Sequence, residues 1–215
     1  MKKILYLFSC VVFIIAFINT ATSYSQRTEG PIVYYTFDSV VNDNIIQDVS
    51  GSDPIIDLQM TSGVTKLPDR NGVVISNADQ SYSHGLFSLE PPAGLTSVIQ
   101  TTNAMTVEIW AQPVDTNLHD ARMVSYSTNS GNRNFSFIMQ FDALEVRLRT
   151  VLSGNNGYDI LLSTDPVFVN LNPDVFHAVY TYDNGVEKVY KDGELIFTFE
   201  ERGSDISNWD NSYPL

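Results

Sequence analysis

A tryptophan, a glutamate and two other polar residues alternate along one short segment in a pattern that suits contact with a sugar. In "MTVEIWAQP", residues 105–113, every second side chain points to the same side of an extended chain, and one such set is Thr106, Glu108, Trp110 and Gln112. Aromatic rings stack on the apolar faces of sugars, while carboxylates and amides hydrogen-bond their hydroxyl groups. We take this set as a candidate binding surface; the alternative is that Trp110 packs beneath a loop or a second sheet.

Arginines form a second candidate site in an otherwise acidic chain. Three of them fall within "RNFSFIMQFDALEVRLRT", residues 133–150. With one more, they lie in segments that we expect to be neighbours in a sheet, on the side that faces away from the core: Arg122, Arg133, Arg147 and Arg149. They could pair with Asp and Glu as a structural network. They could also form a strip that binds anions such as uronic acids, because guanidinium groups bind carboxylates through paired hydrogen bonds.

Oxygen-bearing side chains at two neighbouring loops give a third candidate, a calcium site. Asp38, Asp48 and Ser50 offer the hard ligands that Ca²⁺ prefers. The alternative is turn chemistry, in which Asp and Ser accept hydrogen bonds from nearby backbone amides. Calcium is the one cofactor that the sequence suggests.

Catalytic signatures are missing from the sequence. The three histidines, His84, His119 and His177, are far apart and lack metal-ligand spacing, and neither a Gly-x-Ser-x-Gly motif nor a phosphate-binding glycine loop occurs. His177 lies among Phe176, Ala178 and Val179, where we expect a packed or hydrogen-bonded histidine. The sequence therefore favours a protein that is not an enzyme.

The elements that must carry these residues are predicted to be strands. Alternation at period two dominates residues 26–215, and "AVYTYDNGVEKVYKDGELIFTF" reads as three strands joined by the glycine turns "DNG" and "KDG". Two further strands are expected to place their apolar residues on one face: Phe135, Phe137, Met139 and Phe141 going out, and Leu144, Val146 and Leu148 returning. Leu95, Val98 and Ile99 suggest a short helical turn. We predict an all-β fold, a two-sheet antiparallel jelly-roll sandwich.

Four segments and a pair that precedes them together resemble one family. "TVEIWAQP", "ARMVSYSTNSGNRNF", "VRLRT" and "HAVYTYDNGVEKVYKDGELI", preceded by the pair "YYTFD" and "DVSG", are similar in order and spacing to the concanavalin A-like, laminin-G-like jelly rolls of secreted bacterial proteins. The resemblance covers the chain from about Pro31 to its end. It departs from the family pattern at "HDAR", which replaces the usual glycine-proline before alanine-arginine.

The resemblance implies a glycan-binding or adhesive module. A module that binds another protein within a larger extracellular protein is the alternative, and a glycoside hydrolase on the same fold is the second alternative. Hydrolases of this fold carry Glu-x-Asp-x-x-Glu on one strand, because retaining cleavage needs two carboxyl groups about 5 Å apart. The matching strand here has Glu108 alone.

The first 25 residues predict export. Lys2 and Lys3 precede an apolar run at residues 4–18, and a small polar stretch ending "SYSQ" follows, which is the order of a secretory signal peptide. Cleavage is expected before Gln26, leaving residues 26–215 as one jelly-roll domain. An uncleaved anchor, or a lipid on Cys10, the only cysteine, are the alternatives. We expect the product to be secreted or at the cell surface of a bacterium, without disulfides.

Charge excludes one class of partner. Without Lys2 and Lys3, ten of the 12 basic residues remain against 25 acidic ones, which gives a formal charge of −15. Nucleic acids and anionic membranes are therefore not expected as partners, nor is membrane insertion after cleavage. The expected partners are a glycan or an extracellular protein surface.

The family pattern also predicts further strands after "SNWDNSYPL". An opening strand at residues 32–37 would pair with one of them. We therefore expect the chain to lack its C-terminal strands and to expose a sheet edge, which favours aggregation.

Overall fold

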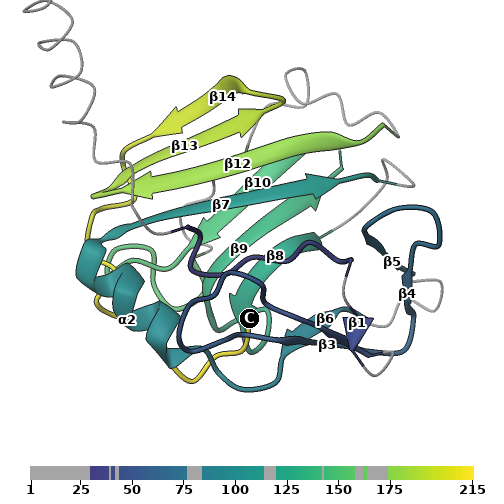
Figure 1. The fold of residues 1–215 in the computed structure, drawn as a ribbon. Coiled ribbons are helices and arrows are strands. Elements are labelled where there is room, and N and C mark those ends of the chain that lie inside the picture. Colours follow the sequence, from purple (N-terminus) through teal and green to yellow (C-terminus); the bar gives the residue numbers. More distant parts are fainter. Residues whose placement is uncertain are drawn as a thin grey trace, which may run out of the picture.

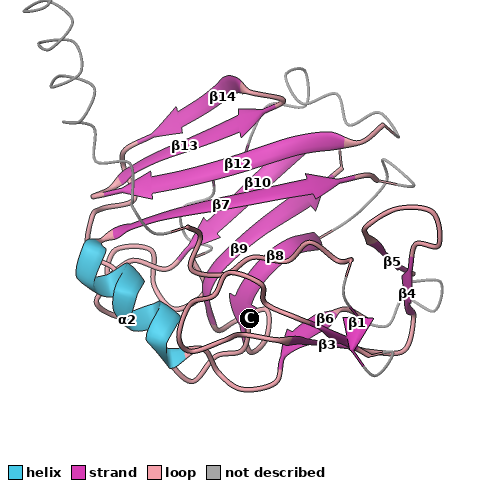
Figure 2. Ribbon diagram, viewed as in Figure 1, coloured by secondary structure: helices cyan, strands magenta, loops and turns pink. Residues whose placement is uncertain are grey.

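The computed structural model describes residues 30–38, 40–41, 44–76, 84–113, 120–141, 143–157, 162–163 and 174–215. The predicted signal peptide and His119 lie outside these residues. Strands form nearly all of the regular structure of these described residues, as Figure 2 shows, and one helix lies among them.

Two four-stranded antiparallel sheets form the sandwich that the sequence predicts (Figure 1). The front sheet has the order β14-β13-β12-β7 and consists of β7 (Ala104–Ala111), β12 (Phe176–Asp183), β13 (Val186–Lys191) and β14 (Glu194–Phe199). The back sheet has the order β11-β10-β9-β8 and consists of β8 (Ala121–Ser127), β9 (Arg133–Gln140), β10 (Ala143–Leu148) and β11 (Leu162–Ser163).

Six short strands make two smaller sheets from the first part of the described chain. One has the order β1-β2-β3-β6 and consists of β1 (Val40–Val41), β2 (Ile45–Ile46), β3 (Leu58–Met60) and β6 (Leu86–Ser88). The other pairs β4 (Val64–Lys66) with β5 (Val73–Ile75). In Figure 1 both lie beside one end of the sandwich.

The strand expected at residues 32–37 is not formed, so that prediction was wrong. Residues 30–38 contain no strand. The backbone of Tyr34 bonds instead to the next loop: its N–H donates to the Asp48 carboxylate at 3.0 Å, and its carbonyl accepts the N–H of Val49 at 2.8 Å. A side chain thus takes the place of a neighbouring strand, which the alternation of apolar residues could not reveal.

The core lies between the front and back sheets. The apolar side chains that alternate along the predicted strands fill it. Phe135, Phe137, Leu144, Val146 and Leu148 of the back sheet are buried, and Ala178, Tyr180 and Tyr182 of the front sheet pack against them. The apolar set of β7, Met105, Val107, Ile109 and Ala111, covers the same core. Burying each large apolar side chain contributes about 1.5–3 kcal/mol. Phe141 is the exception: it lies in the β9–β10 turn with φ 53° and is 51% exposed.

The predicted meander of β12, β13 and β14 is confirmed, with both turns where "DNG" and "KDG" stand. Asn184 and Gly185 have φ values of 49° and 95°, and Asp192 and Gly193 have 52° and 86°. Two successive positive φ values are what a two-residue hairpin turn requires, and Gly and Asn or Asp tolerate them. The hairpin register that these turns set decides which residues of the front sheet lie side by side.

The helical turn suggested by Leu95, Val98 and Ile99 is a full helix, α2 (Ala93–Thr102). It ends at Asn103, whose left-handed backbone lets its carbonyl accept the Asn184 N–H at 3.0 Å. This bond ties the helix end to the β12–β13 turn. Among the described residues, no helix is long and apolar enough to cross a membrane.

An ion pair that the sequence analysis did not anticipate is buried inside the sandwich. The Arg202 Nε lies 2.8 Å from Glu187 Oε1, and both side chains are fully buried. The hydroxyl of Tyr180 donates to the other carboxylate oxygen at 2.8 Å. Burial raises the pKa of Glu187 above its ordinary value, although the positive charge of Arg202 opposes the shift. The pair matters because either charge would be strongly disfavoured here without the other.

The last described segment packs side chains into the core and joins two sheets. Ile206, Trp209 and Tyr213 are buried in the core cluster. The carbonyl of Pro214 accepts the N–H of Ser127 at the end of β8, and the carbonyl of Leu215 accepts the N–H of Ser88 in β6 at 2.9 Å. Residues 206–215 therefore connect the back sheet to the β1-β2-β3-β6 sheet.

Candidate binding surface

The outer face of the front sheet carries the first candidate set from the sequence. Thr106, Glu108 and Trp110 of β7 all point away from the core and are exposed, and Gln112 follows just beyond the strand. Trp110 is 67% exposed, so it does not pack beneath a loop or the other sheet. Single exposed apolar side chains are common on folded domains, so the neighbours of Trp110 decide what its ring can do.

Trp110 is held by an aromatic neighbour on the next strand. β12 pairs with β7 so that His177 lies directly opposite Trp110. The two rings stack with their centroids 4.5 Å apart and an angle of 22° between their planes. One face of the indole is therefore used by the imidazole.

Glu108 fixes the orientation of that imidazole. Its Oε1 lies 2.8 Å from the Nε2 of His177, and a carboxylate only accepts hydrogen bonds, so the Nε2–H donates. The expectation that His177 is packed or hydrogen-bonded is confirmed. Glu108, His177 and Trp110 thus form one connected group, which we call the Trp110 surface.

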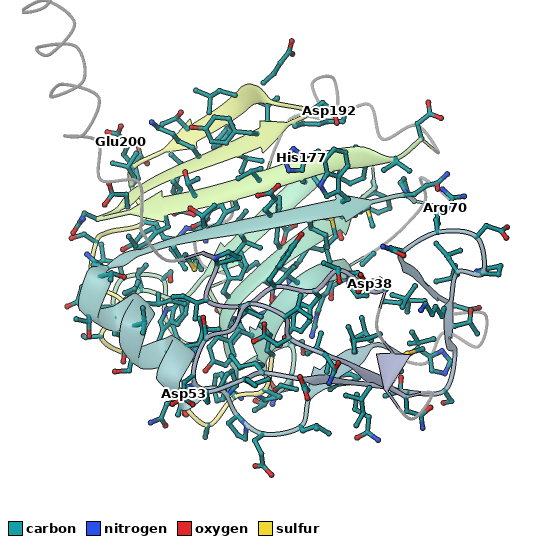
Figure 3. All side chains as sticks on the ribbon, in the orientation of Figure 1. Asp38, Asp53, Arg70, His177, Asp192 and Glu200 are labelled. Carbon is teal, nitrogen blue, oxygen red and sulfur yellow. The ribbon has the colours of Figure 1, made fainter. Side chains whose placement is uncertain are left out.

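The β13–β14 turn adds two charged residues beside the Trp110 surface. The Asp192 carboxylate accepts the N–H of His177 at 2.9 Å and pairs with the Lys191 Nζ at 2.6 Å. The hydrogen bond from the His177 backbone, followed by the one from the Lys191 side chain, lowers the pKa of Asp192. Figure 3 shows His177 and Asp192 close together on the front sheet. Sequence reasoning missed both charged residues, although pairing "HAVYTYD" against "VEKVYKD" through the "DNG" turn would have placed them.

The rest of this face mixes polar and apolar side chains. One row across the strands runs from Glu108 through Val179 and Tyr190 to Leu195, which is 53% exposed. The next row runs from Thr106 through Thr181 and Lys188 to Thr198. Apolar residues are interspersed with hydroxyl and charged groups, so the face is not a broad apolar patch.

The candidate arginines lie on the outer face of the back sheet, but they do not form an exposed strip. Arg147 is 8% exposed: its Nε donates to Glu145 Oε1, and its Nη1 lies 3.5 Å from Asp120 Oδ1. Arg122 lies 3.7 Å from the other oxygen of Asp120. Structural pairing, the first of the two alternatives drawn from the sequence, therefore accounts for Arg122 and Arg147.

The other two arginines have no carboxylate partner among the described residues. Arg149 donates from Nη1 to the hydroxyl of Tyr213 at 3.3 Å and lies over the tyrosine ring, with Cζ 6.0 Å from the ring centroid. Arg133 is 1% exposed and donates from Nη2 to the carbonyl of Ser130. Pairing with Asp or Glu does not explain these two.

At the candidate calcium site, the structure gives Asp48 a role in turn chemistry. Its carboxylate accepts the N–H groups of Tyr34, Ser50 and Ile56 at 3.0, 2.9 and 3.1 Å. Burial acts to raise the pKa of Asp48, but these hydrogen bonds outweigh it and the net shift is downward. Asp38 is exposed and accepts a hydrogen bond from Thr36. Within the described residues, no group of three or more His, Cys, Asp or Glu could hold a metal ion. Calcium binding remains a prediction.

Solved structures share this fold at low sequence identity. The binding domain of botulinum neurotoxin DC, in complex with rat synaptotagmin II, aligns with a TM-score of 0.58 at 15% identity, over 86% of this chain and 43% of that one. A structure of botulinum neurotoxin type C, a toxin whose cell entry depends on interaction with two ganglioside molecules, aligns with a TM-score of 0.57 at 13% identity, over 86% of this chain and 42% of that one. This chain thus spans less than half the length of these structures, and at this identity the likeness shows the fold alone.

Comparison with sequence families is more direct. No curated protein matches the chain. The model of the concanavalin A-like lectin/glucanases superfamily matches residues 90–215, which is more than half of the chain and includes all of the front sheet and the back sheet. This match agrees with the antiparallel jelly-roll sandwich and confirms the resemblance drawn from the sequence. The chain belongs to the concanavalin A-like lectin/glucanases superfamily.

Proposed function

We propose that this protein is a secreted, non-catalytic carbohydrate-binding module and that the Trp110 surface receives the sugar. One observation carries the proposal: an indole that is 67% exposed lies flat on a histidine ring, and that ring is itself fixed by a carboxylate. An aromatic ring held in one orientation loses little conformational entropy when a ligand stacks on it.

The free face of the indole suits the apolar face of a pyranose ring. Polar groups around it match the hydroxyls at the ring edge: the Glu108 side chain is 61% exposed and the Asp192 side chain 51%. Both carboxylates accept hydrogen bonds, so a ligand that offers several hydroxyl donors is favoured over one that offers acceptors. A neutral or basic glycan fits this surface better than an acidic one.

Catalysis is not part of the proposal. The solved structures named above are binding domains, and Glu108 is the one carboxylate of β7. Retaining hydrolysis needs a second carboxyl group about 5 Å from the first, placed across the glycosidic bond. Glu108 is moreover committed to His177 at 2.8 Å. Incubation of the protein with a β-glucan should release no new reducing ends, and their release would refute this part.

A protein-binding module is the second candidate, and one observation favours it. Leu195 is 53% exposed and lies in the same row as Tyr190 and Val179, next to the Trp110 surface. A protein partner would use these apolar side chains in addition to Trp110. Leu195→Ser separates the two candidates: it should leave sugar binding unchanged but weaken a protein complex.

Export is the remaining part of the proposal, motivated by the basic start, the 15-residue apolar run and "SYSQ". The intact mass of the mature product tests it. A mass that begins at or near Gln26 is expected. A product that keeps Met1 or carries a lipid on Cys10 would contradict export by signal-peptide cleavage.

A glycan array tests the binding function itself. We expect the mature protein to bind a restricted set of neutral or basic glycans, and Trp110→Ala to abolish the signal. Tyr34→Ala, which removes another aromatic that is 50% exposed, is the matched control and should leave binding intact. A parallel array with chelator tests calcium: loss of binding there would show that the metal is needed. An array without any hit that depends on Trp110 would refute the proposal.

A further inference from the structure

A bulge at the start of β9 moves Arg133 out of the core face. Along β8 and β9 the register pairs Tyr126 with Phe135 but Ser127 with Arg133, so one step on β8 corresponds to two on β9. By simple alternation Arg133 would share the core face with Phe135 and Phe137. With Asn134 as the extra residue, it lies opposite Ser127, on the outer face of the back sheet.

The guanidinium of Arg133 is buried there without enough partners. The residue is 1% exposed, its Nη2 donates to the carbonyl of Ser130, and its Nε and Nη1 are buried without a hydrogen-bond partner. A guanidinium has five N–H donors, and leaving a buried donor unpaired costs about 1–3 kcal/mol, more when the group is charged. Desolvation lowers the pKa of Arg133 to about 10, with a further contribution from the charges of Arg147 and Arg122. At neutral pH the side chain still carries its charge.

Among the described residues, the carboxylates near Arg133 bind its neighbours rather than Arg133 itself. The group around it contains three guanidinium groups, those of Arg122, Arg133 and Arg147, and two carboxylates, those of Asp120 and Glu145. Glu145 binds the Nε of Arg147, and Asp120 lies between Arg147 and Arg122 at 3.5 and 3.7 Å. Among these described groups, the guanidinium that has no carboxylate bound to it is that of Arg133.

Hydroxyl groups complete the surroundings. Ser136 lies opposite Arg147 in the ladder, and Ser127 lies opposite Arg133. The Ser125 Oγ is 2.8 Å from the Oγ atoms of both Ser127 and Ser136. Serine hydroxyls donate to anions as readily as they accept, so the cations here are accompanied by groups that an oxyanion can use.

We propose that Arg133, together with Arg147, Ser127 and Ser136, forms an anion-binding site for one carboxylate or sulfate group. The planar fork of a guanidinium matches the two oxygens of such a group, and paired N–H to O bonds are among the strongest that proteins form. The anion would take the unpaired Nε and Nη1 of Arg133 and balance its charge. It would enter beside Arg122 and Asp120, whose side chains are 29% and 18% exposed.

This site is independent of the Trp110 surface. It lies on the outer face of the back sheet, and the core separates it from the outer face of the front sheet. Its ligand chemistry is also opposite, since it attracts negative charge where Glu108 and Asp192 repel it. Two sources could supply the group: an acidic sugar, or a free inorganic anion.

Thermal melting of the mature protein in dilute chloride buffer tests the proposal. Sodium sulfate, sodium glucuronate or glucose is added at constant ionic strength. We expect sulfate or glucuronate to raise the Tm saturably, by about 5–10 °C at 100 times the dissociation constant, and glucose to have no effect. A response to glucuronate identifies an acidic sugar as a possible source, whereas a response to sulfate alone identifies the inorganic anion.

Arg133→Met separates binding from a purely structural role. Without added anion the variant should melt at or above the Tm of the native protein, because the buried charge is gone. It should show no saturable response to either anion, whereas Arg70→Met, which removes an exposed arginine, should respond like the native protein. Arg133→Lys keeps the charge without the fork and should bind at least tenfold more weakly. Equal anion responses of the native protein and Arg133→Met, or no response of the native protein, would overturn the proposal.

Discussion

The indole of Trp110 lies on the imidazole of His177 with 4.5 Å between the ring centroids. The two residues are 67 positions apart in the chain, and the antiparallel register of β7 and β12 places them opposite one another. The second strand therefore decides how the tryptophan is presented. The exposed indole is held in place because the imidazole of its neighbour binds Glu108 and the backbone N–H of that neighbour binds the Asp192 carboxylate.

His177→Ala should weaken glycan binding without unfolding the protein. The indole would lose its stacking partner and its fixed orientation, so we expect a three- to tenfold higher Kd, equivalent to about 0.7–1.4 kcal/mol. Titration calorimetry with a glycan from the array measures the change. Thr181→Ala, on the same face of β12, is the control and should bind normally. His177→Phe keeps the stack and should recover part of the affinity, and equal losses in Phe and Ala variants would point instead to the Glu108 bond.

Replacing one member of the buried Arg202–Glu187 pair should lower the free energy of unfolding far more than replacing both. Arg202→Met leaves the Glu187 carboxylate uncompensated in the core, and we expect a loss of about 3–5 kcal/mol in the free energy of unfolding. Glu187→Gln with Arg202→Met removes both charges and should recover most of that loss. Urea denaturation of the three variants measures the coupling. Additive losses would show that the two side chains do not depend on one another.

Arg147→Ala should destabilise the protein and leave glycan binding on the Trp110 surface intact. It leaves Glu145, which is 4% exposed, without its guanidinium partner, so we expect a loss of about 3–5 kcal/mol. Arg70→Ala, at an exposed position, should change stability by less than about 0.5 kcal/mol. Chemical denaturation and glycan titration of both variants provide the check. An unchanged unfolding free energy for Arg147→Ala would contradict the structural role.

Ionisation of the Asp48 carboxylate should make the stability of the fold depend on pH. Its pKa is lower in the folded chain than its ordinary value of 3.8, so the folded state favours the ionised form. Its contribution is therefore fully present above pH 3.8 and is lost as the pH falls through the lower folded pKa. Asp48→Asn should reduce the Tm at pH 7 and make the difference from the native protein shrink below pH 3.8. A Tm difference that is constant between pH 7 and pH 3 would contradict this linkage.

Sequence reasoning succeeded for features that the residues of a single strand or a single turn determine. Alternation placed Val107 and Leu144 on the core side and Trp110 on the outer side, and the "DNG" and "KDG" turns fixed the meander. These features depend on local geometry, because side chains alternate along any strand and glycine turns tolerate positive φ. The family could be recognised for the same reason, because its strand segments follow one another along this chain in the family's order.

The errors concern features that depend on distant partners. Arg133 faces away from the core as expected, but it does so through a bulge at Asn134 that the sequence did not reveal, because alternation with Phe135 alone would have placed it in the core. Glu187 obeys the alternation of β13 and so faces the core, where Arg202, 15 residues later, compensates it. Neither a bulge nor a buried ion pair leaves a periodic mark in the sequence. Residues 32–37 look like a strand but bond to Asp48 instead.

The indole N–H signals of the two tryptophans provide the most direct test of the sugar site. Trp110 is 67% exposed, whereas Trp209 is 6% exposed and its Nε1–H donates to the carbonyl of Arg149 at 2.8 Å, so it serves as an internal control. A glycan from the array is titrated into ¹⁵N-labelled protein, and both signals are followed. The account predicts a saturable shift of the Trp110 signal and a stationary Trp209 signal. A bound glycan that leaves the Trp110 signal unmoved would contradict it.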